Sequence, residues 1–318
     1  MTLWLIPVAQ RLGSLVLVLL TTSFIVFAAM YLAPGSPESF LVRGNSVTAE
    51  TLQAIRDQYH LDEPFLTQYV LWLGGVLRGD FGLSIQFRQP VAALLASRVP
   101  TTAFLVAYAS VLILVVGVLA GALAAVKRGA VDGAAIIVST VAMATPSFVV
   151  AMALTSLFSV TLGWFPAFGA GTGLSGRLWH LTMPAAALAL SSAALVLRTT
   201  RTALIGALGK EYVETARVRG FSARRVIWAQ AFRGAIVPVV TLIGLVISGL
   251  LVTTTIVETA FGLNGIGSLL VQAVNVKDFP VVQAVILIIV AVFVVSNMIV
   301  DLVYPLLEPR ARAKGSAR

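Results

Sequence analysis

The sequence predicts an all-α, polytopic membrane protein with six transmembrane helices and with both termini in the cytoplasm. Of its 318 residues, 11% are charged and 58% are hydrophobic, and the charges are confined to short intervals between long apolar runs. Soluble domains carry about 25% charged and 45–50% apolar residues, so this chain cannot cover a soluble fold with polar surface. The high apolar content also excludes an intrinsically disordered chain.

Six charge-free runs approach or exceed the roughly 20 apolar residues that a helix needs to cross a bilayer. They are Leu12–Ala33, Val99–Val126, Ala134–Leu162, Leu181–Leu197, Gly234–Val257 and Phe279–Val300. The first run is too long for the apolar core of a signal peptide, so we expect it to be retained as a helix. The fourth run is short, and we expect its helix to continue past Arg198, whose long side chain can snorkel toward water.

The distribution of charge sets the predicted orientation. With the termini inside, the inner intervals carry 15 basic and five acidic residues, whereas the outer intervals carry seven basic and eight acidic residues. An excess of Lys and Arg marks the cytoplasmic side of a membrane protein. The net charge of +9 therefore reports topology, and we expect membrane lipid rather than nucleic acid as the surroundings of this chain.

These intervals divide the chain into four parts. They are a first transmembrane helix over residues 1–33, an extracytoplasmic helical segment over 34–98, a five-helix core over 99–307 and a basic cytoplasmic tail over 308–318. The core contains one long polar interval on the inner side, over residues 198–233.

The extracytoplasmic segment has the pattern of short helices. Thr48 can cap one helix, and Asp62-Glu63-Pro64 is typical of the start of another. Apolar residues at helical spacing follow, namely Phe65, Tyr69, Trp72, Leu73, Val76 and Leu77. The stripe ends at Arg78–Gly82, which is a turn by composition. We expect a packed cap over the helices, or part of a docking surface for an external partner.

The inner interval predicts a helix, a tight turn and a second helix. Glu211–Arg219 places acidic residues early and arginines late, which suits the helix dipole. Gly220 can end that helix in the left-handed conformation, and Ser222 can cap a second helix over Ala223–Phe232. Such an elbow could transmit movement to a soluble partner. The alternative is an amphipathic interfacial loop that has no partner.

The segment Glu211-Tyr-Val-Glu-Thr-Ala-Arg-Val-Arg-Gly-Phe-Ser222 resembles the "EAA" loop of bacterial ABC importer permeases. It is most similar to the version EYVxTARAKGLS of the dipeptide, oligopeptide and nickel branch. Other segments that resemble the first-type (B-like) subunit of this branch are Leu32–Pro37, Leu61–Pro64, Gln68-Tyr69, Trp72–Gly75, Leu77–Gly82, Pro146–Phe148, Leu162–Pro166, Val257–Gly262, Asp278–Gln283 and Asp301–Tyr304. The chain departs from the pattern at Ser36, where Asp is usual, and at Gln230 and Gly234, where His and Asn are frequent.

This resemblance implies a type I ABC importer permease. The family assembles with a second homologous permease, two cytoplasmic ATPase domains and an extracytoplasmic substrate-binding protein. ATP and Mg²⁺ belong to the ATPase chains, so we expect no cofactor and no catalytic residue in this chain. The residues that match the ATPase-coupling loop are Glu211, Tyr212, Glu214, Thr215, Ala216, Arg217, Arg219, Gly220 and Ser222.

Polar residues within the spans are candidates for the translocation path, because such residues are costly in lipid and often functional. The candidates are Ser191, Ser248, Thr253 and Thr254. The alternative is that their hydroxyls bond to the backbone of their own helix. On the outer side Asp80, Glu258 and Asp278 are candidates for docking the binding protein or a substrate amine.

Other chemistries lack the residues that they need. The chain has no Cys, its two His residues are His60 and His180, and no phosphate-binding loop occurs, so nucleophilic and metal sites are not expected. Gly171–Gly176 matches G-x-G-x-x-G, but it lies between two spans and is interpreted as a flexible turn. Gly117 and Gly121 form G-x-x-x-G and predict close helix packing within the subunit.

Three alternatives to peptide import stay open. The same type of complex could import nickel chelates, glutathione or cell-wall peptides. A proton-coupled secondary transporter would need an acidic or histidine relay within the spans, and Asp301 lies at the edge of one. An intramembrane hydrolase would need a nucleophile or metal constellation.

Overall fold

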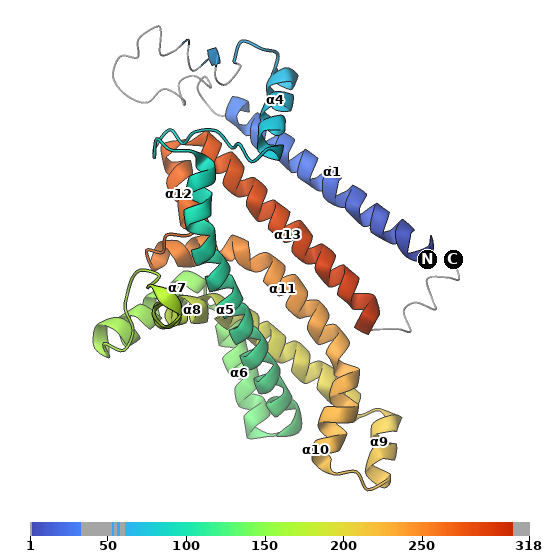
Figure 1. The fold of residues 1–318 in the computed structure, drawn as a ribbon. Helices are drawn as coiled ribbons and strands as arrows, with labels where there is room; N and C mark the ends of the chain where they lie inside the picture. Colours follow the sequence, from blue (N-terminus) through green and yellow to red (C-terminus); the bar gives the residue numbers. More distant parts are fainter. Residues whose placement is uncertain (1, 33–52, 54–55, 58–60, 308–318) are drawn as a thin grey trace. The chain divides into compact units, whose positions relative to one another are not determined.

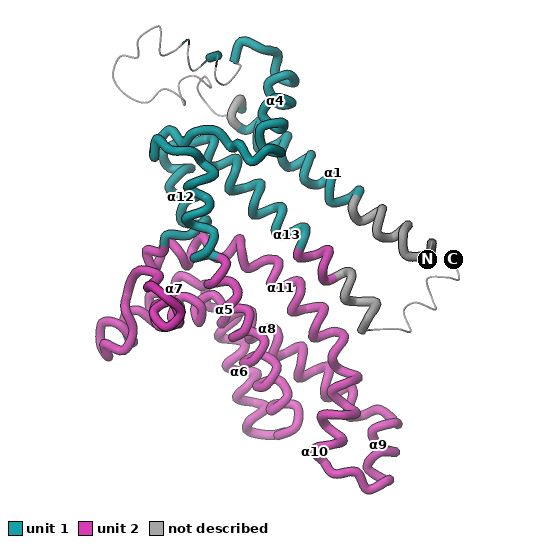
Figure 2. The backbone as a smooth tube through the Cα atoms, in the orientation of Figure 1, with its two compact units in different colours: residues 1–102, 264–295 teal, residues 103–263, 296–318 magenta. Residues whose placement is uncertain are grey.

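The computed structural model describes residues 2–32, 53, 56–57 and 61–307. In this part the regular structure is helical, with one isolated bridge between Leu83 and Pro90. The chain forms two compact units (Figure 2). Unit 1 contains residues 1–102 and 264–295, and unit 2 contains residues 103–263 and 296–318. The predicted all-α class is confirmed, whereas the capping residue Thr48 and the tail 308–318 lie outside the described residues.

Unit 1 contains a pair of helices joined by aromatic side chains. These are α1 (Thr2–Leu32) and α4 (Phe65–Leu77), and α4 begins after Pro64 as predicted (Figure 1). The Phe27 ring lies within 5.3–5.6 Å of the rings of Phe65, Tyr69 and Trp72. The Tyr69 hydroxyl lies 2.8 Å from that of Ser23. Three residues of the predicted stripe of α4 therefore pack on α1, whereas Leu77 at its end is exposed.

The second core of unit 1 lies where α5 (Val91–Val126) and α13 (Phe279–Leu307) begin. Val91, Leu94 and Leu95 of α5 pack there against α12 (Ile266–Val276) and the first turns of α13. No helix was predicted from the sequence between residues 257 and 279, so α12 is an addition. Its buried side includes Ile266, Leu269 and Ala273.

Unit 2 is organised around α8 (Gly173–Leu208), which packs against α6 (Ala130–Ala144), α7 (Ser147–Leu154) and α11 (Phe232–Ala260). The buried surface of α8 is rich in alanine, which allows neighbouring helices to approach closely. A Cβ atom on Gly117 would lie 2.8 Å from Cβ of Val196, and one on Gly121 would lie 2.5 Å from the carbonyl oxygen of Leu197. The G-x-x-x-G motif thus packs α5 on α8 within the subunit, as predicted.

The third predicted span, Ala134–Leu162, is not one straight helix. Its two halves, Ala130–Ala144 and Ser147–Thr161, meet at an angle of 104°. Thr145 is extended, with ψ 121°, because the proline that follows it at position 146 disfavours the helical conformation. The second half ends in the π-helical segment η1 (Thr155–Thr161).

The predicted spans also change at their ends. α8 is longer than Leu181–Leu197 and continues past Arg198, as expected. Among the described residues, four helices are long and apolar enough to cross a membrane, and the bent pair would make a fifth. The apolar part of α1, Gly13–Ala29, falls just below that length. Six spans and cytoplasmic termini therefore stay a prediction.

Candidate coupling loop and translocation path

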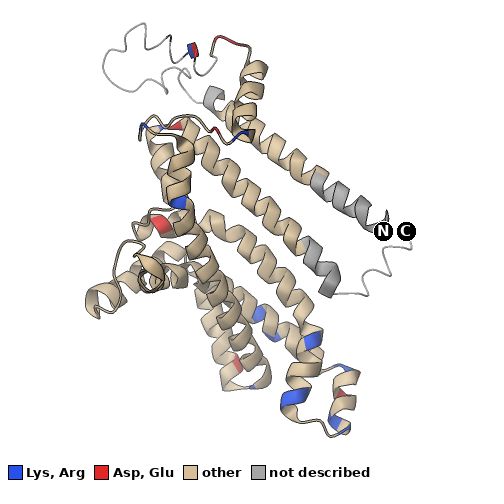
Figure 3. Cartoon of the chain, viewed as in Figure 1, with Lys and Arg blue, Asp and Glu red and all other residues tan. Residues whose placement is uncertain are grey.

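The predicted elbow is present and contains α9 (Glu211–Val218), α10 (Ala223–Arg225) and the π-helical segment η2 (Val226–Ala231). The second helix of the elbow is not separate, because residues 223–260 form one continuous helix that runs into α11. This differs from the prediction, which ended that helix at Phe232. Several Lys and Arg residues, coloured blue in Figure 3, occur along this part of unit 2.

A glycine turn ends α9. The amide of Phe221 donates to the carbonyl of Ala216, and the amide of Gly220 donates to that of Arg217, at 3.2 and 2.9 Å. This pair of bonds is the Schellman motif, which requires a left-handed residue at its fifth position. Gly220 occupies that position with φ +80°. Ser222 stands at the N-cap of α10, although its side chain makes no capping bond.

Two small apolar side chains hold α9 against the neighbouring helices of unit 2. Val213 and Ala216 are buried in a cluster with residues of α5, α8 and α11, among them Ala122, Leu204 and Ala235. The remaining predicted coupling residues of this loop are exposed: Glu211, Tyr212, Glu214, Thr215, Arg217, Arg219, Gly220 and Ser222. One face of α9 is therefore anchored and the other is free to meet a partner.

The structure adds two residues that were not singled out from the sequence. Val213 supplies the anchor, and its spacing of three from Ala216 was a signal for a shared helix face. Val218 is 83% exposed at the end of α9, next to Arg219. Val218 thus adds an apolar group to the exposed, otherwise charged face of this loop.

Tyr212 meets one of the positions at which the chain departs from the family pattern. Its hydroxyl lies directly against Gly234 of α11, where any Cβ atom would collide with it. Gly234 therefore leaves space for Tyr212 at a position where the resembling family often has Asn.

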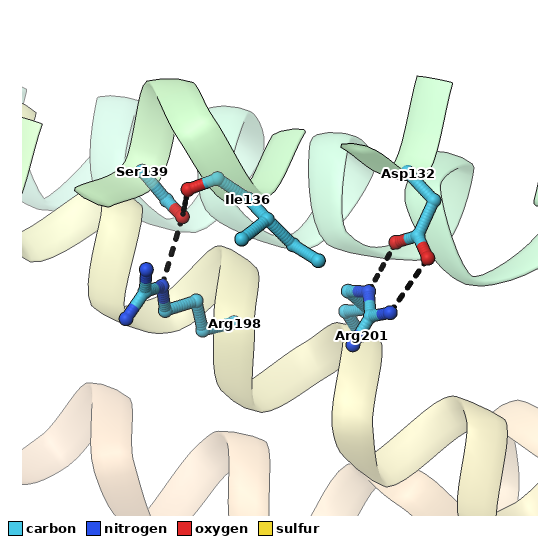
Figure 4. Close-up of polar contacts among 5 residues, drawn as sticks. All are labelled: Asp132, Ile136, Ser139, Arg198 and Arg201. Carbon is cyan, nitrogen blue, oxygen red and sulfur yellow. Dashed lines mark hydrogen bonds and ion pairs between the residues drawn. The ribbon is translucent and has the colours of Figure 1, made fainter. Parts of the chain in front are cut away.

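Two arginines of α8 bind polar side chains of α6 within unit 2 (Figure 4). Arg201 donates from Nε to Oδ1 of Asp132 and from Nη2 to Oδ2, the latter at 2.6 Å. One turn away, Arg198 donates to the hydroxyl of Ser139 at 2.9 Å and to that of Thr140. Arg198 thus bonds to α6 within the subunit. In the sequence, Arg198, Arg201 and Asp132 indicate only the topology. The ion pair and hydrogen bonds that they form with neighbouring helices were not predicted.

The four candidate path residues do not share one environment. Ser248 and Thr254 are buried, and their hydroxyls donate to carbonyls of their own helix at 2.9 and 2.7 Å. Thr253 also bonds to its own helix, at 2.9 Å, but is exposed. Ser191 is exposed on α8. Ser191 and Thr253 are therefore the two candidates that present a polar group at the surface of this chain.

The three candidate docking carboxylates also differ. Asp80 is exposed, and its Oδ1 accepts a bond of 2.9 Å from the amide of Gly82. Glu258 and Asp278 are buried within the chain. Asp278 is engaged inside unit 1, where its Oδ2 accepts bonds from the Ser84 hydroxyl and the Gln86 amide. Of the three, Asp80 is the one that a docking partner could reach in this arrangement.

Comparison with known proteins assigns the chain to a family. A family model described as the inner membrane component of binding-protein-dependent transport systems matches residues 113–313. A second model, for the N-terminal part of such membrane components, matches residues 4–106. The chain belongs to this family. It is an inner-membrane permease subunit of a bacterial ABC importer, as its loop and its apolar helices indicated.

Relatives align with the permease along almost its whole length. One is named as a peptide transport system permease of Brucella abortus (strain 2308), 35% identical over 309 residues that cover 96% of this chain and 98% of the relative. A protein of Brucella melitensis with a corresponding name has the same identity and coverage. A glutathione transport system permease protein of Escherichia coli (strain K12) is also 35% identical, over 96% of this chain and 99% of its own length.

Proposed function

We propose that this permease imports di- or oligopeptides, delivered by an extracytoplasmic substrate-binding protein, as one half of a heterodimer with a second permease. Two cytoplasmic ATPase domains hydrolyse ATP, and this chain itself has no catalytic role. The names of the 35% identical relatives support the peptide cargo. ATP and Mg²⁺ bind in the ATPase chains.

The exposed face of α9 carries the mechanistic part of the proposal. Val213 and Ala216 fix the helix to unit 2, so movement imposed on its free face passes to α8 and α11 instead of being absorbed by a linker. The free face offers the carboxylates of Glu211 and Glu214 and the apolar Val218, whereas Arg217 lines a cleft beside the ends of α5 and α8. The ATPase binds this face, and its closure on ATP shifts the permease between two global states.

The path of the solute needs weakly polar groups, because peptides share backbone amides but differ in side chains. Ser191 and Thr253 supply hydroxyls at the surfaces of α8 and α11. On the outer side, Asp80 contributes to docking of the binding protein.

Glutathione is the second candidate cargo, and the relative from Escherichia coli supports it. Glutathione is a small peptide with free carboxylates, so the same hydroxyl-lined path could pass it. Nickel chelates and cell-wall peptides have no comparable support among these relatives.

Co-purification followed by an ATPase assay tests the proposal. The tagged permease is co-expressed with the second permease, the ATPase chains and the binding protein, then purified in mild detergent and reconstituted. We expect ATP hydrolysis that rises when the binding protein is loaded with peptide. Stimulation by glutathione alone would transfer the assignment to the second cargo. A permease that purifies without an ATPase would contradict the proposal, and proton-coupled uptake would then be measured.

A further inference from the structure

The geometry points to a binding site for an anionic phospholipid in a cleft of unit 2. The cleft has a volume of about 440 Å³, within the 300–1,000 Å³ of typical ligand sites. Its lining comes from the ends of α5 and α8 and from the elbow that follows them: Ala125, Val126, Arg128, Ile205, Leu208, Gly209, Arg217 and Ile227. The phosphate of a lipid headgroup binds the two arginines of this lining.

The lining combines two kinds of surface. Among the described residues that line it, Arg128 and Arg217 are the charged ones and none is acidic. Guanidinium groups bind phosphate oxygens in pairs of parallel hydrogen bonds. The aliphatic side chains around them, such as Val126, Ile205 and Leu208, suit the glycerol and first methylene groups of the same lipid.

Both guanidinium groups are available for a ligand. Arg128 and Arg217 are exposed, and within the part of the chain that the structure describes the guanidinium of neither forms an ion pair or a hydrogen bond. The nearby Asp132 is not a competitor, because Arg201 binds both of its carboxylate oxygens. Among the described residues, the cleft therefore holds two arginines and no acidic residue of its own, and Asp132 outside it interacts with Arg128 only through its charge.

The position of the cleft favours a lipid over a soluble anion. α5 is apolar up to Val126 and is followed by Lys127 and Arg128, so the cleft begins where that helix leaves the hydrocarbon. The charge distribution predicts that this is the cytoplasmic side, where anionic headgroups attract basic residues by about 1 kcal/mol each. An acidic segment of a partner protein would pair with the arginines but would leave the aliphatic walls without matching apolar groups.

Lipid retention by the assembled complex tests the site. The complex is placed in nanodiscs of phosphatidylcholine with a minor fraction of phosphatidylglycerol, and bound lipids are counted by native mass spectrometry. The test variant is Arg128→Gln with Arg217→Gln. The matched control, Arg224→Gln with Arg233→Gln, removes the same charge from exposed positions of the same region that do not line the cleft.

We expect a retained phosphatidylglycerol in the wild type and in the control, and its loss in the test variant. Its affinity should fall about fivefold for each guanidinium removed, and about thirtyfold for both. The Arg128→Lys and Arg217→Lys pair should recover part of the binding, since it restores charge without the bidentate geometry. These readouts do not depend on transport, so they stand whatever the cargo is.

Three results would overturn the proposal. Equal lipid retention by the test and control variants would show that the cleft is not the site. Release of the lipid by millimolar inorganic phosphate would show that the arginines bind small anions. Cross-linking of Leu208→Cys to an ATPase chain in the assembled complex, with no lipid retained, would identify a protein as the occupant.

Discussion

The Ser84 hydroxyl donates a hydrogen bond of 2.6 Å to Asp278 Oδ2, although the two residues are 194 positions apart. The same oxygen accepts a bond of 3.0 Å from the amide of Gln86, and the amide of Phe87 donates to Ser84 Oγ at 2.9 Å. Asp278 directly precedes α13, and Ser84 lies in the turn before α5. One buried carboxylate therefore holds this turn against the start of α13 within unit 1.

Replacing Asp278 should loosen that attachment. Asp278→Ala removes the acceptor of two hydrogen bonds and leaves the Gln86 amide without this partner. We expect a loss of about 2–4 kcal/mol in the stability of the subunit. Asp278→Asn keeps an acceptor of the same shape and should cost about 1 kcal/mol. Thermal unfolding of the purified complex measures both, and the exposed Glu63→Gln serves as the control. Equal stability of the alanine variant and the control would show that this carboxylate does not hold the turn.

Close packing of α5 on α8 gives a second prediction. Gly121→Ala would place Cβ 2.5 Å from a backbone oxygen and 2.7 Å from Thr200 Cβ, so the helices must separate. Overpacking of this kind costs about 1–3 kcal/mol. Gly133→Ala is the matched control, because Gly133 is helical and a methyl group added there would have no atom within 4 Å. There the better helix propensity of alanine should raise stability by up to about 1 kcal/mol. The fraction of complex that stays monodisperse after heating is measured for both variants. We expect it to fall for Gly121→Ala and to rise for Gly133→Ala.

The fold was largely predictable because apolar runs report helices in a membrane directly. The runs do not report bends. Prolines at positions 100, 184 and 238 lie inside α5, α8 and α11, whereas Pro146 separates α6 from α7. A single sequence does not distinguish these cases, because neighbouring helices can satisfy the backbone groups that a proline frees. The sequence does not reveal the continuity of the elbow with α11 for a similar reason, since Arg233 interrupts the apolar run.

The ion pair between Asp132 and Arg201 should make these two residues energetically coupled. Asp132→Asn and Arg201→Gln each leave one charge without its partner, whereas the double variant removes both charges together. The double variant should therefore lose less stability than the sum of the single variants. Lys127→Gln, an exposed basic residue close in sequence, is the charge control. Strict additivity in the double-mutant cycle would show that the pair does not hold α6 on α8.

Within the site, the sequence predicted the turn more fully than the path. The Schellman turn needs one left-handed residue after a short helix, and Gly220 was visible in the sequence. The burial of Ser248, Thr254, Glu258 and Asp278 was not visible, because it depends on which helix face meets a neighbour. Polarity within a span shows that a residue is unusual, but packing decides whether its polar group lines a path, bonds to its own helix or joins two segments.

Gly220 provides the sharpest test of the coupling role. Its φ of +80° lies in the left-handed region, where other L-residues pay about 1–2 kcal/mol and β-branched residues pay more. Gly220→Val should therefore lower the population of the native turn by about tenfold or more and should uncouple ATP hydrolysis from uptake. A Cβ atom added at Gly220 would have no atom within 4 Å, so the effect would come from the backbone and not from a clash. Gly220→Asn is the matched control, because asparagine tolerates the left-handed conformation. Uptake and peptide-stimulated ATPase activity are measured for both variants after their membrane insertion has been verified. Normal uptake by the valine variant would show that the turn after α9 does not transmit ATPase closure.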